Sequence, residues 1–194
     1  MIQQTARPGR QHYVFGFSPS TRVTLSNNHI DGESPYSTGC EGGYHYWTFE
    51  MVGEDDQITM QGNYITKTGG RSPALSGGTL LHAVNNVWED NDGHALEGGD
   101  EKARGIFEGN AFVNVNSLVA DYAGRLYAAD ENNVDCSAAL GRDCEPNVLD
   151  NSNGEFPELD TSFFSEFEGL SIASAVAASE AQKNVPANAG AGKL

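Results

Sequence analysis

An asparagine repeat constrains the fold of this 194-residue chain more than any other feature. Asn28, Asn63, Asn86 and Asn110 follow one another at steps of 35, 23 and 24 residues. An apolar pattern recurs five and three positions before each asparagine and two positions after it. The residues are Val23, Leu25 and Ile30 around Asn28; Ile58, Met60 and Ile65 around Asn63; Leu81, Ala83 and Trp88 around Asn86; and Gly105, Phe107 and Phe112 around Asn110. Only Gly105 breaks the apolar pattern. A step of about two dozen residues is typical of one coil of a parallel β-helix.

This repeat predicts an all-β fold, a right-handed parallel β-helix of roughly four to five coils. Alternate side chains would point inward and stack on the coil below, and Trp88 would belong to the core. The asparagines would tolerate the left-handed conformation at a turn and form a hydrogen-bonded ladder. The step of 35 residues indicates one coil plus an insertion within residues 32–46. An antiparallel sandwich would instead need hairpin loops every 8–12 residues, and the repeat is too long for that.

The asparagine repeat is absent after Val115. We therefore expect coils over about residues 1–115 and an irregular C-terminal cover over about 116–194, within one partial domain spanning 1–194. Residues 163–182 are partly amphipathic and predict a short helix, or a strand followed by a helix. The last segment, 184–194, has the composition of a mobile tail.

Composition excludes several classes of function. The net charge of −16 and the pI of about 4.4 argue against a nucleic-acid partner. A hydrophobic content of 38% is too high for a disordered chain. There is no apolar run close to the roughly 20 residues of a membrane span, so we expect no membrane partner.

The beginning of the chain and its cysteines indicate different compartments. Residues 1–15 show no charged segment followed by an apolar one, so no signal peptide is visible. Cys136 and Cys144 flank a short loop that a disulfide could close, which would indicate an oxidising compartment, while Cys40 stays single. Three free thiols are the alternative. The odd cysteine and the missing signal together suggest that the natural N-terminus precedes Met1.

One arginine occupies an unusual loop, "KTGGRSPAL" over residues 67–75. Gly69 and Gly70 precede Arg71, and Pro73 follows it. Taken alone, this is the pattern of a solvated turn arginine. The sequence predicts no metal site, because His12, His29, His82 and His94 lack the spacing of metal ligands and fit structural roles.

Five stretches of the chain are distinctive: "ARPGRQHYVFG", "RVTLSNNHIDG", "GGYHYW", "GNYITKTGGRSP" and "TLLHAVNNVWEDNDGHALEGG". They resemble the fungal pectin lyases, which are secreted polysaccharide lyases with a right-handed parallel β-helix. The resemblance covers roughly the C-terminal half of a family member, and Cys136 and Cys144 fit the family pattern of a disulfide. It implies an extracellular enzyme that needs no cofactor and acts on methylated pectin, and it implies a monomer when the chain is complete.

The resemblance also implies roles for single residues. Arg71 matches the proposed base that removes the C5 proton of a methyl-esterified galacturonan, and Arg10 matches the arginine that steadies the acidic moiety. Trp47 and His45 match an aromatic segment that lines the substrate cleft. Ala74 departs from the pattern, since many members carry a lysine three residues after the base. Leu75 and Ser76 stand where pectate lyases have a second arginine.

Three functions therefore compete. The first is a pectin lyase that cleaves by β-elimination and leaves a 4,5-unsaturated product. The second is a truncated, inactive β-helix that binds pectin without cleaving it. The third and weaker one is a calcium-dependent pectate lyase, although no pair of calcium carboxylates is evident near Arg71 in the sequence.

Overall fold

The computed structural model describes residues 11–18, 20–34 and 43–193, and within them the chain forms three parallel sheets of five strands each. The first sheet contains β1 (Tyr13–Phe15), β4 (Phe49–Met51), β7 (Ala74–Leu75), β10 (His94–Gly98) and β13 (Ser117–Tyr122). The second contains β2 (Arg22–Ser26), β5 (Gln57–Gln61), β8 (Leu80–Val84), β11 (Arg104–Glu108) and β14 (Arg125–Ala128). The third contains β3 (His29–Asp31), β6 (Tyr64–Thr66), β9 (Val87–Glu89), β12 (Ala111–Val113) and β15 (Val148–Asp150).

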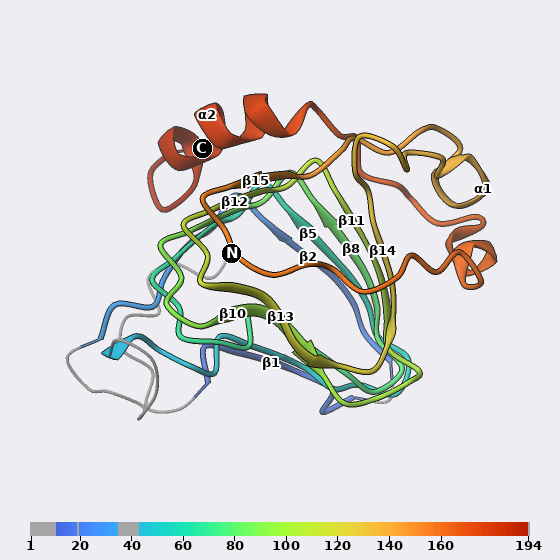
Figure 1. The fold of residues 1–194 in the computed structure, drawn as a ribbon. Coiled ribbons are helices and arrows are strands. Elements are labelled where there is room, and N and C mark those ends of the chain that lie inside the picture. The colour runs from blue at the N-terminus through green and yellow to red at the C-terminus, as the bar shows by residue number, and fades with distance from the viewer. Residues whose placement is uncertain (1–10, 19, 35–42, 194) are drawn as a thin grey trace.

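Successive strands along the chain belong to the first, second and third sheet in turn, and each set of three strands forms one coil that stacks on the previous coil. This arrangement is a parallel β-helix. Figure 1 looks nearly along its axis, with β1, β10 and β13 on one wall, β2 to β14 on the second, and β12 and β15 on the third. All strand pairs named here are parallel, so the predicted fold class is confirmed and the antiparallel sandwich is excluded.

The predicted inward positions stack as expected. In the second sheet Leu25 pairs with Met60, and the column continues through Ala83 to Phe107. In the third sheet Trp88 lies between Ile65 and Phe112 and is completely buried, which confirms it as a core residue. Its ring stacks on that of Phe112 with centroids 4.8 Å apart.

Gly105 breaks the apolar pattern because the core is already full at that point. A Cβ atom there would lie 3.3 Å from Cδ2 of Leu75 and 3.4 Å from Cβ of Leu81. These contacts are tighter than ordinary van der Waals packing, so a side chain at position 105 would displace its neighbours.

The asparagine ladder is present and is longer than predicted. The side-chain amide of Asn63 donates to Oδ1 of Asn86 at 2.8 Å, and that of Asn86 donates to Oδ1 of Asn110 at 3.1 Å. The amide of Asn28 donates to Asn63, and that of Asn110 donates to Asn147 in the next coil, each at 2.9 Å. The ladder thus connects all five coils.

From the sequence we expected the ladder asparagines themselves to adopt the left-handed conformation. In the structure it is the residue before each of them that does so. Asn27, Gly62, Asn85 and Gly109 have φ angles of 55°, 62°, 52° and 58°. The ladder asparagines are thereby free to point inward and saturate the main-chain groups of adjacent coils.

The predicted boundary between coils and cover, at about residue 115, lies too early. β13, β14 and β15 add a further strand to each sheet, and Asn147 continues the ladder 37 residues after Asn110. The segment between β14 and β15, which contains Cys136 and Cys144, lengthens this step. The first insertion begins and ends at an antiparallel bridge between Glu33 and Tyr44, and its middle lies outside the described residues.

The C-terminal cover contains α1 (Ser137–Leu140), a 3₁₀ helix (Phe164–Phe167) and α2 (Ala178–Asn188). α2 lies over β9 and β12, as Figure 1 shows at the outer side of the third sheet. The segment 184–194, predicted to be a mobile tail, instead continues α2 to Asn188, and the N–H of Gly190 donates to the carbonyl of Asn27 at 2.9 Å. This segment is ordered because α2 packs against the third sheet, a contact that composition does not predict.

A second apolar cluster joins this cover to the outer face of the second sheet. Phe163, Phe164 and Phe167 are buried against Ile106 and Tyr127. The cover thus shields outward-facing apolar side chains that the coil interior does not use.

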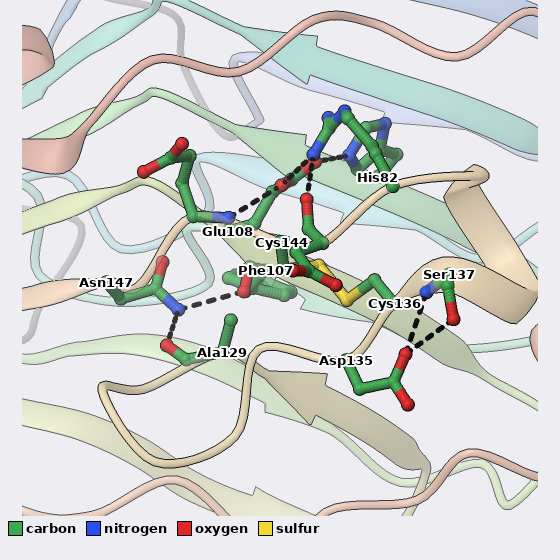
Figure 2. Close-up of a disulfide and its surroundings, with 12 residues drawn as sticks. His82, Phe107, Glu108, Ala129, Asp135, Cys136, Ser137, Cys144 and Asn147 are labelled. Atoms are coloured by element: carbon green, nitrogen blue, oxygen red, sulfur yellow. Dashed lines mark hydrogen bonds and ion pairs between the residues drawn. A yellow bond between two sulfur atoms is a disulfide. The ribbon is translucent and has the colours of Figure 1, made fainter.

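The predicted disulfide between Cys136 and Cys144 is confirmed, with Cα atoms 5.4 Å apart, while Cys40 lies outside the described residues. Figure 2 shows this bond beside the buried pair His82 and Glu108, whose Nε2 and Oε1 atoms are 2.7 Å apart. Arg142, in the disulfide loop, donates to both carboxylate oxygens of Glu108, at 2.7 and 2.8 Å. It also donates to the carbonyl of Ala173 at 3.0 Å and so ties the loop to the cover.

Burial opposes the charged form of Glu108, but the hydrogen bonds from His82 and Arg142 outweigh it and hold the pKa of Glu108 below its ordinary value. His82 thus has the structural role that its sequence context predicts. Among the described residues, the helices are too short or too polar to cross a membrane.

Candidate active site

The candidate site lies on the outer face of the first sheet. Glu50 in β4, Ala74 in β7 and Glu97 in β10 are partners in register and form one row across three coils. Their neighbours Met51, Leu75 and Leu96 are completely buried in the core. Because side chains alternate along a strand, the row that contains the two carboxylates points outward.

Arg71 reaches this row from the loop between β6 and β7. Its Nη1 atom donates to Oε1 of Glu50 at 2.6 Å. Its Nε atom lies 2.8 Å from Oε1 of Glu97, close enough for an ion pair although the N–H is not aligned for a hydrogen bond. The guanidinium carbon is 5.4 Å from the centre of the Tyr46 ring. The side chain of Arg71 remains 32% exposed, so it is held in place but accessible.

The main chain holds Arg71 in an unusual conformation. Its φ angle of 48° is left-handed, which is uncommon for a residue other than glycine. The N–H of Phe49 donates to the carbonyl of Arg71 at 2.7 Å, and the N–H of Ser72 donates to the carbonyl of Ala95 at 2.8 Å. The indole of Trp88 donates to the carbonyl of Ser72 at 2.6 Å. These bonds tie the loop to both flanking coils and to the core, which stabilises a costly backbone geometry.

Gly70 has a definite role beside Arg71. A Cβ atom at this position would lie 2.6 Å from Cε2 of Tyr46 and 3.1 Å from Cε1 of His94. The main chain at Gly70 thus approaches these two rings closely. Glycine is therefore required at position 70, because a larger residue would prevent Tyr46 from packing against Arg71.

Glu97 is shared among several partners. Tyr46 donates its hydroxyl to Oε2 at 2.8 Å, and Nε2 of His94 contacts the same oxygen. Burial opposes ionisation of Glu97, but the bonds from His94 and Tyr46 and the charge of Arg71 outweigh it, so its pKa lies below the ordinary value. Burial and the bond to Glu97 raise the pKa of Tyr46 to about 12. Glu97 is therefore a carboxylate and Tyr46 a neutral donor at neutral pH.

Arg71 itself is a cation in this arrangement. Burial opposes its charge, but the hydrogen bond to Glu50 and the charges of Glu97 and Glu50 outweigh that effect and raise the pKa of Arg71 above its ordinary value. A second cation and a dry site, which a base at this position would need, would lower its pKa. The described residues instead supply two carboxylates.

The other predicted site residues have different positions. Arg10 lies outside the described residues. His45 is buried, with 1% of its surface exposed, and stacks on His12 with ring centroids 4.2 Å apart. Trp47 is half-buried, and its ring meets that of Tyr46 edge-on at 5.8 Å. The structure thus places Trp47 next to the Arg71 cluster, in contact with Tyr46. His45 is instead buried against His12.

His12 is the stacking partner of His45. Burial, followed by the charge of His45, lowers the pKa of His12 to about 4, so the stacked pair contains a neutral His12 at neutral pH. This agrees with the structural role predicted for His12.

Sequence reasoning did not predict Glu50, Glu97 and Tyr46 as site residues, and it assigned His94 to a structural role. The available signal was the alternation in "YWTFEM" and "HALEGG", which places Glu50 and Glu97 on outward positions. No group of three or more metal-ligating side chains gathers anywhere in the described part of the chain.

A groove of about 200 Å³ lies elsewhere, between the second sheet and the cover. Thr24, Thr59, His82, Phe167 and Ile172 are among its lining residues, and none of the Arg71 cluster is. The cluster combines an accessible cation, two carboxylates and a strained backbone, and so is the better candidate for chemistry.

Comparison with known proteins gives a consistent result. No family model matches the chain. The chain is 65% identical over 192 residues to "Probable pectin lyase A" of Aspergillus flavus and to "Probable pectin lyase C" of Aspergillus oryzae, which covers 98% of this chain and 51% of each relative. It is 50% identical over 193 residues to "Probable pectin lyase C" of Aspergillus niger, with 98% of this chain and 51% of the relative covered. The chain is related to the pectin lyases.

The chain spans about half the length of the curated pectin lyases that it matches. Arg71 and both of its carboxylate partners lie within the shared part, since the match includes 98% of this chain.

Proposed function

We propose that the protein carrying this chain is a pectin lyase that cleaves methyl-esterified galacturonan by β-elimination at Arg71, and that it works outside the cell. The observation that supports this most is the accessible guanidinium of Arg71, fixed on the outer face of the first sheet in a chain related to pectin lyases. A polysaccharide is long, and an open outer face of a β-helix can receive it along several coils.

The chemistry needs a base near C5 and a cation near the C6 oxygen. The C5 proton is acidic because it is α to the C6 carbonyl, and a methyl ester accepts the developing negative charge better than a carboxylate does. Charge collects on the C6 oxygen as the C5 proton is removed. It then passes to O4, which departs with the neighbouring sugar when the C4–O4 bond breaks and the C4–C5 double bond forms. A fixed guanidinium stabilises such a charge without reorganisation, which is commonly the largest contribution to catalysis.

Arg71 remains our candidate for the base, and its environment sets a condition on that role. A base must be neutral, whereas Glu50 and Glu97 stabilise the cation. We infer that the substrate must separate Arg71 from these carboxylates before proton abstraction. In the arrangement described here, Arg71 is suited to bind and orient the sugar and to stabilise charge on it.

Arg10 and Trp47 keep the roles that the resemblance implies, as proposals, and we propose a supporting role for His45. Trp47 is well placed for substrate contact, since it is half-buried beside Tyr46. His45 is buried and would act by supporting the segment that carries Trp47, to whose carbonyl its Nε2 lies at 3.2 Å.

Absorbance of unsaturated uronides, measured with highly methylated pectin with and without a chelator, tests this function. A pectin lyase gives the absorbance in both conditions, and loss of product with chelator would indicate the calcium-dependent pectate lyase. The stabilised cation of Arg71 favours one other candidate, a non-catalytic pectin-binding β-helix. Binding of methylated pectin without unsaturated product would support that candidate.

A further inference from the structure

The row Glu50, Ala74, Glu97 carries more negative charge than Arg71 neutralises. Two carboxylates face one guanidinium, and their side chains are only 12% and 17% exposed. Charges with so little solvent contact are screened less than surface charges. The same oxygen of Glu97 also accepts from Tyr46, a neutral donor, and contacts Nε2 of His94.

Ala74 makes this arrangement possible. It pairs with Glu50 on one side and with Glu97 on the other, so the two glutamates are two strand spacings apart, about 9–10 Å between main chains. A side chain of one methyl group leaves the space above β7 open, and the guanidinium of Arg71 lies there with one nitrogen toward each carboxylate. A long side chain at position 74 would occupy this space.

The contacts of Arg71 decide which sugar it can accept. A guanidinium with free nitrogens pairs readily with a carboxylate and would favour de-esterified galacturonate. Here Nη1 and Nε already contact Glu50 and Glu97. A free galacturonate carboxylate that pairs with Arg71 would lie close to the negative charges of Glu50 and Glu97, whereas a methyl ester carries no charge and avoids this repulsion.

We propose that Glu50 and Glu97 form a charge filter that selects the methyl ester over the free carboxylate at the sugar bound beside Arg71. This inference rests on the proposed function, because it deepens the substrate choice of the same site. Ala74 allows both glutamates to contact Arg71, because its methyl group leaves room for the guanidinium between them.

The test compares Glu50→Gln and Glu97→Gln with Glu101→Gln, a matched change at an exposed turn glutamate outside the cluster. Glutamine keeps the size and the acceptor oxygen but removes the charge. Two quantities are measured: the ratio of kcat/KM on highly methylated and on de-esterified galacturonan, and the ratio of equilibrium affinities for methylated and de-esterified oligogalacturonides. We expect each site variant to lower both ratios about tenfold, mainly through a lower KM and tighter binding of the de-esterified ligand, and Glu101→Gln to leave them unchanged.

A second variant, Ala74→Lys, keeps both carboxylates and places a cation between them. It should shift both ratios in the same direction, and it decides the question if a glutamine variant does not fold. Unchanged ratios in the folded variants would overturn the filter.

The two proposals fail in different ways. If the protein gives no unsaturated product but its binding preference follows the variants, the lyase function is wrong and the filter stands. If it gives product and the variants keep the same ratios, the filter is wrong and the function stands.

Discussion

The indole nitrogen of Trp88 donates a hydrogen bond to the carbonyl of Ser72 at 2.6 Å, so a fully buried core residue of the third sheet holds the loop that presents Arg71. Trp88 pairs with Ile65 and Phe112 in the stacked coils. The position of the candidate catalytic side chain is therefore coupled to the packing of the β-helix interior.

We predict that Trp88→Phe lowers the free energy of unfolding by about 1–3 kcal/mol beyond the loss of packing, because the Ser72 carbonyl stays buried without its donor. Turnover should fall as well, since the Arg71 loop loosens. Phe112→Leu is the control, because it disturbs the same stack without touching that carbonyl. Urea unfolding and kcat are the measurements, and a Trp88→Phe protein with unchanged kcat would contradict the coupling.

The centre of the asparagine ladder should be far more sensitive than its end. Asn86 is fully buried and takes part in four side-chain bonds, to Met60, to Asn110 and twice with Asn63. We expect Asn86→Ala to cost at least about 3 kcal/mol, because several buried partners are left unsatisfied.

Asn28→Ala is the matched control for this prediction. Asn28 is partly exposed, and its side chain donates to Ser26 and Asn63. Its loss should cost about 1 kcal/mol. Equal losses for the two variants in denaturant titrations would show that the ladder does not carry the stability that its geometry suggests.

The repeat allowed the fold to be predicted because each ladder asparagine and its inward neighbours occupy fixed offsets in every coil. Asn147 was missed since the disulfide loop lengthens its coil, and the end of the coil region was therefore placed too early. Arg71 was found through family resemblance. Glu50 and Glu97 were missed because outward residues on a strand look alike in sequence, and only the register across coils shows that both flank Ala74.

The disulfide should be detectable by chemistry as well as by stability. Alkylation without reduction should leave Cys136 and Cys144 unlabelled in material from an oxidising compartment, as mass spectrometry would show. Replacing both by serine should cost about 2–3 kcal/mol, in line with closure of a short loop. Labelling of either cysteine in such material would refute the pairing. Cys40 is expected to be labelled.

Glu108 should make the fold sensitive to acid. Because its pKa is lower in the folded state than in the unfolded chain, its contribution to stability is complete above about pH 4.3 and is lost as the pH falls through the folded value. Glu108→Gln should therefore cost about 3 kcal/mol at neutral pH, by breaking a buried ion pair, and should weaken the dependence of stability on pH below about 4.3.

Urea unfolding at several pH values checks this prediction, with Glu155→Gln, at an exposed position, as the control. An acid dependence that is the same in the Glu108→Gln protein as in the wild type would contradict the assignment to Glu108.

The most direct test of the central claim is the rate of unsaturated uronide formation from highly methylated pectin, with chelator present, by the wild-type protein and by Arg71→Lys. Lysine keeps the positive charge but loses the planar fork that contacts both Glu50 and Glu97. The account predicts steady product formation by the wild type and loss of most of it in the variant, with both proteins equally folded. Wild-type rates in Arg71→Lys would contradict it.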